Sequence, residues 1–368
     1  MNHDTLTSFD RLCYRLACVI YLLRMNVLQT DSHKSPEVES KRKSAGLSAA
    51  ARKVFGIREI NIFIVLLALS SFIYSQKSGF MSAYNIRTVL ESFSIYALLA
   101  IGETLVILTA GIDLSVGSLV GLIGFLAAYW MALGLPMALA IGAALALSLA
   151  IGYIHGFFVT KLGVAPFIIT LGTLIIARGA AALPTYGKHV SNVPEAFSAI
   201  AWSHIGPLPT PAIVLLSFAV AAALITNYTT LGRDIYAIGG NIEAARLAGI
   251  NVDRRRTFCY MASSFLAGVA GILVASKLSS GDPTVGVGYE LPAIAAVVIG
   301  GASLMGGEGT IAGTLLGGAL MSVLANGLIL LQVNTYWHEI CMGSVVVIAV
   351  TLDSLRRRKK RFSKSQSP

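Results

Sequence analysis

Long apolar segments alternate with short polar ones from residue 60 to residue 355. Most of these segments are long enough, at ~1.5 Å of rise per residue, for a helix that crosses a hydrocarbon core about 30 Å thick. The pattern therefore predicts an all-α polytopic membrane protein with about ten transmembrane helices. The expected spans are 60–75, 94–110, 115–133, 137–160, 166–183, 211–227, 257–276, 291–301, 310–331 and 340–355.

The composition agrees with this fold class. Of the 368 residues, 55% are hydrophobic and 12% are charged, and the mean hydropathy is +0.74. One soluble core could not bury so much apolar surface. The 36 glycines suit close contacts between membrane helices, and small-xxx-small pairs such as Gly152 with Gly156 are expected to form them.

Two apolar stretches indicate broken helices near the centre of the fold. Residues 94–134 would form a helix of roughly 60 Å, so the stretch is expected to be two spans with a break at residues 111–115. The segment 291–301 is short for a crossing and runs into a Gly-rich stretch. By helix parity the spans that begin at residues 94 and 257 run in opposite directions, so the repeat that the similar Gly and hydropathy pattern of the two halves favours would be of inverted topology.

The basic residues are concentrated in three segments. Residues 1–59 contain ten Lys and Arg, residues 228–256 contain five and residues 353–368 contain seven, together 22 of the 28 in the chain. An even number of expected spans separates these segments, and the positive-inside rule places all three in the cytoplasm. The net charge of +10 is thus explained by membrane orientation, and no nucleic acid partner is expected. The basic tail 356–368 is expected to face membrane lipid.

The predicted domains are an N-terminal extension, a membrane domain and a tail. Residues 1–59 are expected to be cytoplasmic and largely disordered. Their apolar run 16–23 is too short to span, and it is interpreted as an interfacial helix, a signal peptide or a non-native stretch before a start at Met25. The membrane domain covers 60–355, interrupted by the cytoplasmic loop 228–256, and the tail covers 356–368.

Two carboxylates in the stretch 94–134 are candidates for function. Glu103 lies within an expected span and Asp113 lies at the break. A carboxylate in hydrocarbon is costly, so each is expected to face protein or water. Asp113 could cap the following helix or line a polar pathway, and Glu103 could bond a packed helix or line that pathway. The candidate pathway residues are Glu103, Thr109, Asp113, Ser115 and Ser118.

The loop 228–256 contains a short helix pattern. Asn241 is a good N-cap, Glu243 lies in the first turn and Gly249 lies at the C-terminal end. The small apolar face of this helix favours a docking surface for a partner over an inert connector. The residues expected to make that contact are Asn241, Glu243, Ala244, Ala245, Arg246 and Gly249.

Other chemical sites are not indicated. The sequence contains no GxxxxGK[ST], HExxH or GxSxG pattern, so no nucleotide site or hydrolase centre of its own is expected. The four cysteines have neither CxxC nor zinc-site spacing. Histidines such as His155 are scattered and are expected to be ordinary interfacial residues. We therefore predict no bound cofactor and no metal.

Three ordered motifs resemble the membrane permeases of bacterial ABC sugar importers of the ribose, xylose and arabinose type. They are LVILTAGIDLSVGSLVGL at 105–122, LGRDIYAIGGNIEAARLAGINV at 231–252 and YELPAIAAVVIGGASLMGGEGTIAGTLLGG at 289–318. The likeness covers roughly residues 60–353. Glu308 departs from the pattern, since members similar to the ribose permease have Lys there, and the N-terminal extension exceeds what the family carries.

The resemblance implies partners and residue roles. It implies a second permease subunit in a homo- or heterodimer, a periplasmic sugar-binding protein and a separate cytoplasmic ABC ATPase that hydrolyses ATP. Residues 241–249 match the loop that seats in the ATPase, and residues 111–118 match the signature near the translocation path. The implied location is the bacterial inner membrane, with both termini cytoplasmic.

The resulting hypothesis is the non-enzymatic translocation subunit of an importer for a neutral monosaccharide, a pentose or similar polyol. A second hypothesis is a proton-coupled sugar carrier that uses Glu103 or Asp113 as its proton site. A third is a membrane subunit with no transport role. Uptake driven by a pH gradient without ATP would favour the second, and loss of sugar uptake on deletion would exclude the third.

Overall fold

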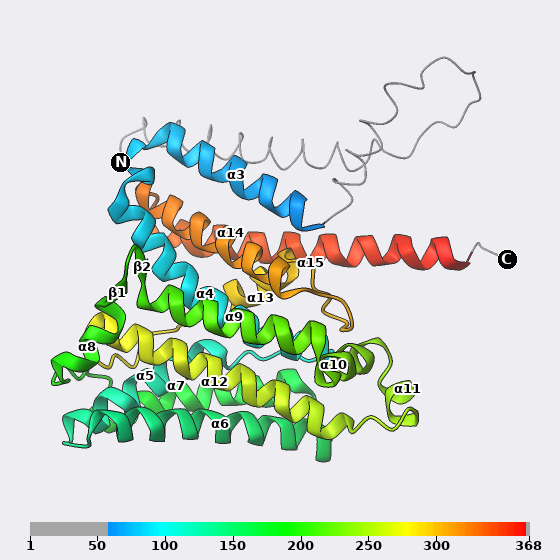
Figure 1. Cartoon of the computed structure of the whole chain (residues 1–368), viewed down its shortest axis with the longest axis horizontal. Helices are drawn as coiled ribbons and strands as arrows, with labels where there is room; N and C mark the ends of the chain where they lie inside the picture. The colour runs from blue at the N-terminus through cyan, green and yellow to red at the C-terminus, as the bar shows by residue number, and fades with distance from the viewer. Residues whose placement is uncertain (1–57, 366–368) are drawn as a thin grey trace. The chain divides into compact units, whose positions relative to one another are not determined.

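The computed structural model describes residues 58–365, with side chains at all of these positions except 58, 335, 352 and 355–365. The predicted properties of residues 1–57 and 366–368 lie outside the described residues. Ten helices correspond to the ten expected spans (Figure 1). They are α3 (Arg58–Gln76), α4 (Ala83–Leu108), α5 (Val116–Ala132), α6 (Met137–Lys161), α7 (Pro166–Ala182), α9 (Thr210–Tyr228), α12 (Val252–Leu278), α13 (Glu290–Ile299), α14 (Ile311–Leu330) and α15 (Thr335–Ser365).

The expected all-α membrane fold is confirmed. Seven of the described helices are long and apolar enough to cross a membrane, and three shorter apolar segments lie within α5, α13 and α15. The shortest, α13, has ten residues. Helix α15 continues to residue 365. It therefore passes without a break through the expected boundary between the last span and the basic tail.

Helix α4 begins eleven residues before the predicted start at Ser94. The added turns carry polar residues that lower hydropathy but have partners in the fold. Glu91 pairs with Arg87 at 3.0 Å and with Lys277 of α12 at 2.8 Å. The expected span 94–110 has Glu103 near its middle, whereas in the longer helix α4 this residue lies near the C-terminal end.

Smaller elements occupy the two ends of the helices. One end, here the α8 end, holds η2 (Ser78–Met81), η3 (Leu183–Thr185), α8 (Glu195–Trp202) and the hairpin β1 (His204–Ile205) with β2 (Leu208–Pro209). The other end, here the α10 end, holds α10 (Thr230–Gly240) and α11 (Ile242–Leu247). Of these, only a helix within 241–249 was predicted from sequence.

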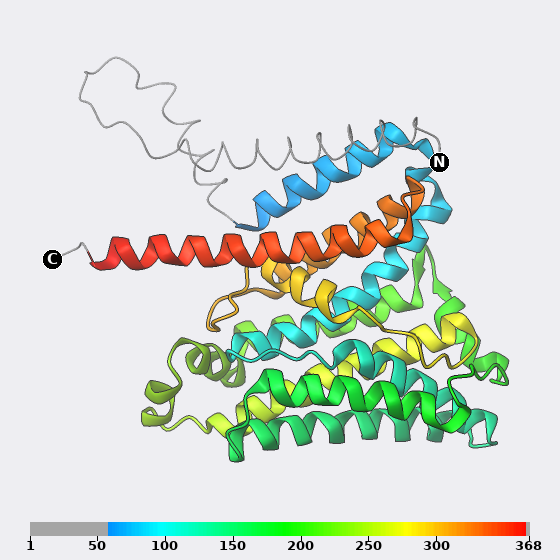
Figure 2. The ribbon, with the colours of Figure 1, turned by 180° about the vertical axis from the view of Figure 1, so that it is seen from behind.

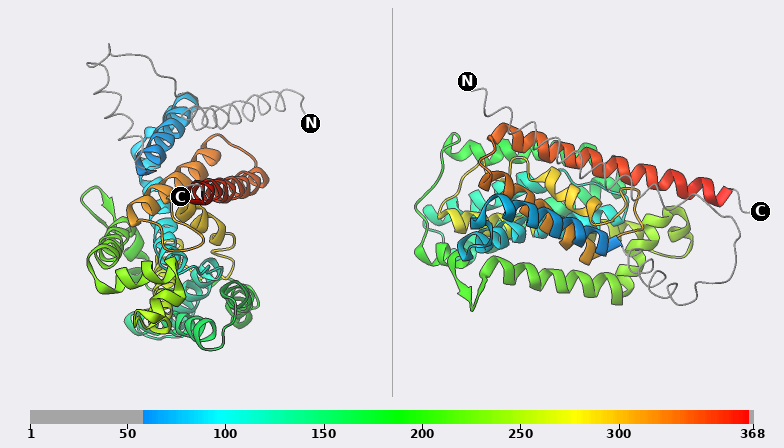
Figure 3. Two further views of the ribbon diagram at one scale, coloured as in Figure 1. Left: turned by 90° about the vertical axis from the view of Figure 1, so that its right-hand side faces the viewer. Right: turned by 90° about the horizontal axis from the view of Figure 1, so that it is seen from above.

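The direction of each helix agrees with the predicted parity. Helix α3 begins at the α10 end and α15 ends there, while the segment 228–256 also lies at that end (Figures 1 and 2). The two described basic segments therefore share one end of the helices. Viewed along the helices, α3, α14 and α15 lie on one side of α4, and α6, α7 and α12 lie on the other (Figure 3).

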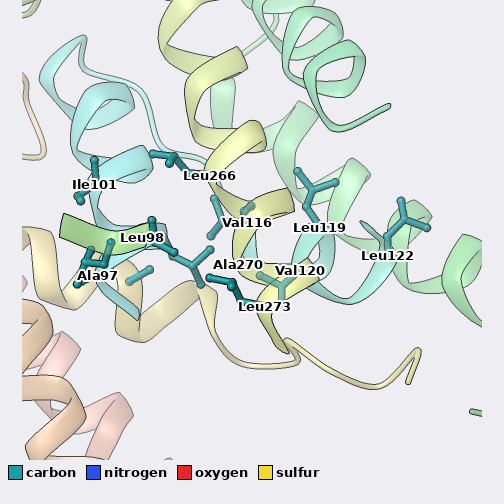
Figure 4. Packing of buried hydrophobic residues seen from close by; sticks show 14 of the residues in the cluster. Ala97, Leu98, Ile101, Val116, Leu119, Val120, Leu122, Leu266, Ala270 and Leu273 are labelled. Carbon is teal, nitrogen blue, oxygen red and sulfur yellow. The ribbon is translucent and has the colours of Figure 1, made fainter. Parts of the chain in front are cut away.

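The core is built around α4, α5 and α12. Ala97, Leu98 and Ile101 of α4 are fully buried against residues such as Leu119 of α5 and Ala270 of α12 (Figure 4). Between helices in lipid the hydrophobic effect does not favour the burial of apolar side chains, because lipid tails are equally apolar. These contacts are therefore stabilised by van der Waals packing.

Glycines bring several of these helices into backbone contact. A Cβ at Gly152 of α6 would lie 2.6 Å from the Met261 Cα and the Tyr260 carbonyl of α12. A Cβ at Gly156, one turn later, would lie 2.6 Å from the Thr257 Cα. The expectation that this small-xxx-small pair closes a helix contact is confirmed.

Replacement of Gly152 by Val is expected to destabilise the α6–α12 contact by roughly 1–3 kcal/mol, because the added atoms meet backbone that cannot move aside alone. Gly142→Val on the same helix is the control, since a Cβ there has nothing within 4 Å. The measurement is the thermal unfolding midpoint in detergent, and equal midpoints for the two variants would contradict the prediction.

Candidate functional site

The chain folds back on itself directly after α4. Ala110 takes a left-handed backbone with φ of 59°, and the Gly111 amide donates to the Val106 carbonyl at 3.1 Å. Residues 109–115, called here fold-back 1, then run back beside α4, so that the Asp113 amide donates to Glu103 Oε1 at 3.1 Å. The predicted break near residues 111–115 is confirmed.

The Asp113 carboxylate anchors the start of α5. Its Oδ1 accepts from the Ser115 amide at 3.0 Å and from the Ser115 hydroxyl at 2.6 Å. Its Oδ2 accepts from the hydroxyl of Ser263 on α12 at 2.9 Å. Ser115 is the N-cap residue, but its own side chain makes no capping bond and instead donates to Asp113.

The five predicted pathway residues are all buried, with exposures of 0–3%. Glu103, Asp113 and Ser115 form one bonded cluster, whereas the Thr109 and Ser118 hydroxyls donate to the Val106 and Ser115 carbonyls. Glu103 Oε2 has no hydrogen-bond partner among the described residues. The cluster is thus enclosed in this conformation, and its contact with substrate stays a prediction.

His155 and Tyr260 lie next to this cluster. A Cβ at Gly111 would collide with the Tyr260 hydroxyl, so a larger residue would displace this buried tyrosine where fold-back 1 crosses α12. The His155 ring meets the Tyr260 ring edge-on at 6.2 Å between centroids, and its Nε2 lies 2.9 Å from the Thr173 hydroxyl. His155 is fully buried inside the bundle, six residues before the end of α6, and its interfacial depth stays a prediction.

A second fold-back, residues 279–289, follows α12 and leads into α13. Its Asp282 Oδ1 accepts from the Thr284 amide at 2.8 Å and from the Thr284 hydroxyl at 2.7 Å. The turn has the geometry of the Asp113 turn, and its sequence Asp-Pro-Thr-Val-Gly at 282–286 matches Asp-Leu-Ser-Val-Gly at 113–117. This shared pattern is visible in the sequence, and it could have identified the two regions as matching parts of a repeat.

The two matched motifs meet inside the bundle. A Cβ at Gly117 would lie 2.5 Å from the Gly286 carbonyl, and a Cβ at Gly286 would collide with the Gly117 carbonyl. Helix α4 ends at the α10 end and α12 ends at the α8 end, so the two units run in opposite directions (Figure 1). This arrangement agrees with the inverted repeat predicted from glycine pattern and parity.

The helix predicted within 241–249 is formed by α11. Asn241 Oδ1 accepts from the Glu243 and Ala244 amides, each at 3.0 Å. Gly249 has a φ of +81° and closes the C-terminal end, while the Ile250 amide donates to the Ala245 carbonyl. Of the predicted docking residues, Ala245 is buried and the other five are exposed. Leu247 projects from α11 with 91% of its surface exposed.

Helix α10 connects α11 to both Gly-rich connections at this end. A Cβ at Gly239 would collide with the Leu108 carbonyl at the end of α4 and with the Gly307 amide, which itself donates to Leu108 at 3.0 Å. The Tyr236 hydroxyl donates to the Gly309 carbonyl at 2.7 Å, and burial raises the pKa of this phenol. Sequence reasoning missed α10, although Thr229 caps it and Ile235 and Ile238 form its buried face.

Residues 85–350 match the family model described as the permease component of branched-chain amino acid transport systems. The chain belongs to this permease family. It is 42% identical over 305 residues to the ribose import permease protein RbsC of Escherichia coli (strain K12), an alignment that covers 82% of this chain and 95% of the relative.

Two further relatives agree with this membership. The xylose transport system permease protein XylH of E. coli (strain K12) is 32% identical over 83% of this chain and 95% of its own length. RbsC of Bacillus subtilis (strain 168) is 35% identical over 87% of this chain and 98% of its own length. The recognition of the ABC sugar-importer permeases from the three motifs is therefore confirmed, and the chain is a multi-pass membrane permease.

Replacement of Asp113 by Ala is expected to destabilise the protein by about 2–4 kcal/mol, because three buried donors on Ser115 and Ser263 lose their acceptor. Asp282→Ala removes the matching turn at a partly exposed position and is expected to cost less. Thermal unfolding in detergent measures both. A shift for Asp282→Ala as large as that for Asp113→Ala would contradict the anchoring role.

Proposed function

We propose that this permease is the translocation subunit of an ABC importer that moves a monosaccharide, a pentose or similar polyol, across the bacterial inner membrane. The observation that carries the proposal is the alignment with a ribose import permease over 95% of that relative's length. The xylose permease relative supports a pentose in particular. The chain acts without a cofactor or metal of its own.

The α10 end faces the cytoplasm in this proposal. The basic residues of 228–256 and of the tail gather there, as the positive-inside rule requires of a cytoplasmic face. Both termini are then cytoplasmic. The α8 end, with its hairpin, faces the periplasm and receives the sugar from a binding protein, and a second permease subunit completes the path.

Helix α11 is the docking element for a separate ATPase that hydrolyses ATP. An almost fully exposed leucine flanked by Glu243 and Arg246 is unfavourable in water and suits an apolar socket in a partner. The capped ends make α11 rigid, so a push on it is passed to α10 rather than absorbed.

Helix α10 passes this motion to the membrane domain. Through Gly239 it touches the end of α4, where fold-back 1 begins, and the loop between α13 and α14. Closure of the ATPase could therefore shift both halves of the repeat together and bias the permease between an outward and an inward opening.

A proton-coupled carrier is the second candidate, and one observation favours it. Glu103 Oε2 lies buried without a partner among the described residues, beside the Asp113 turn. A buried carboxylate of this kind could bind and release a proton. Uptake by vesicles under an imposed pH gradient without ATP would support this candidate, and uptake that needs ATP and the ATPase would support the importer.

Leu247→Asp is expected to abolish sugar uptake and co-purification of the partner ATPase, because the new aspartate would bring a charge into an apolar socket. Ile205→Asp, at a residue with 73% exposure in the hairpin at the α8 end and outside every candidate span, is the control for the substitution itself. Both proteins should insert normally. Normal ATPase recovery with Leu247→Asp would contradict the docking role.

Gly239→Ala is expected to leave the ATPase bound and active but to lower sugar uptake at least about tenfold, a barrier change of roughly 1.4 kcal/mol. The added methyl would force α10 away from Leu108 and Gly307. Gly240→Ala is the matched control, since a Cβ there has nothing within 4 Å. Uptake and ATP hydrolysis are measured in the same vesicles, and equal uptake by both variants would exclude this coupling route.

A further inference from the structure

An ion pair lies between α7 and the start of α13. Arg178 is the one charged residue of the candidate span Pro166–Thr185. Its Nη2 donates to Glu290 Oε1 at 3.0 Å across 112 positions of sequence. The Arg178 side chain is 37% exposed and the Glu290 side chain 12%. None of the predicted pathway residues belongs to this pair.

The charge of Arg178 disfavours hydrocarbon as its surroundings. A guanidinium inside a membrane span faces protein or a water-filled cavity, because hydrocarbon cannot solvate it. Arg178 Nε and Glu290 Oε2 also have no hydrogen-bond partner among the described residues. Unpartnered polar atoms beside a buried ion pair cost stability, so stability alone does not account for this pair.

Two aromatic rings lie next to the pair along the chain. Tyr289 directly precedes Glu290, and its ring packs on Tyr96 of α4 with 5.3 Å between centroids and an angle of 57°. Both tyrosines are partly exposed. A planar fork of N–H donors, a carboxylate and aromatic faces together can bond the hydroxyls of a sugar and pack on its C–H face.

The surface around this group is open in the described structure. Val287 is 57% exposed and Leu291 is 45% exposed, on either side of Tyr289 and Glu290. The second fold-back is therefore partly exposed, whereas fold-back 1 is enclosed. Polar and aromatic side chains are partly exposed here, whereas Asp113 is fully buried.

We propose that Arg178, Glu290, Tyr289 and Tyr96 form a face of the translocation path that contacts the sugar during its passage. The proposal deepens the proposed function and rests on it for the identity of the solute. The Arg178–Glu290 pair supplies hydrogen bonds to hydroxyl groups, and the two tyrosines supply the apolar contact. The ligand class is a neutral pentose or hexose.

The first test is access of water to this face. In a chain whose four cysteines are replaced by serine, Leu291→Cys is expected to react with a charged, membrane-impermeant thiosulfonate reagent about tenfold faster than Ile176→Cys, since a thiol in lipid forms little thiolate. Ile176 is 70% exposed and lies on the opposite face of α7 from Arg178. Equally slow labelling of the two cysteines would overturn the proposal.

The second test is protection of Leu291→Cys by sugar. A panel of neutral pentoses and hexoses, with D-ribose and D-xylose among them, is added before the reagent, and glycine betaine at equal osmolarity is the control. At least one sugar is expected to slow labelling. Adding Arg178→Lys, which keeps the charge but loses the planar fork, or Tyr289→Leu is expected to remove that protection while the unfolding midpoint and ATPase recovery stay unchanged.

The outcomes separate this proposal from the proposed function. Fast labelling with no protection by any sugar overturns the sugar contact. Protection that survives both substitutions overturns the assigned residues, and leaves the pair as a structural tie. ATP-dependent uptake of the same sugars is measured on the unaltered permease. Absence of this uptake would count against the proposed function, while protection of Leu291→Cys would still test whether the sugar contacts these residues.

Discussion

The structure depends on a constraint that an apolar medium places on irregular backbone. Amide and carbonyl groups outside a helix have no water to bond there, so such a segment has to be enclosed by protein or line a polar cavity. Fold-back 1 is enclosed: Asp113 and Glu103 accept its amides, and Ser263 of α12 fixes it from the other side. The second fold-back meets Gly117 of α5 through Gly286, which holds the two irregular segments together.

Backbone contacts at glycines also join α10 to the membrane helices. Helices α4 and α12 run in opposite directions, and α10 touches the connections at one end through Gly239. Glycine is needed at each crossing because a Cβ would meet backbone. In the proposed function, a small displacement at α11 would be passed through these backbone contacts to the end of α4 and to the loop between α13 and α14.

The two groups of buried charges have different surroundings. Asp113 satisfies nearly all of its capacity within the chain, which suits an anchor. Arg178 and Glu290 keep unpartnered buried atoms, and the Arg178 side chain is 37% exposed, which suits a pair at the edge of a surface that meets a polar solute. Asp113 bonds Ser263, and Arg178 bonds Glu290, across segments far apart in sequence. Because a buried charge is costly, each of these charged side chains is found where the packing supplies a partner.

The sequence by itself determined the ten spans, the breaks, the capped helix at 241–249 and the family, because hydropathy, capping and motifs are local properties. It misplaced the start of α4, since the partners of Glu91 are not visible in a hydropathy pattern. Only the tertiary structure decided that Asp113 meets Ser263, that Arg178 meets Glu290 and that α10 touches both connections. These contacts depend on how helices pack across more than a hundred residues, and no local pattern encodes that.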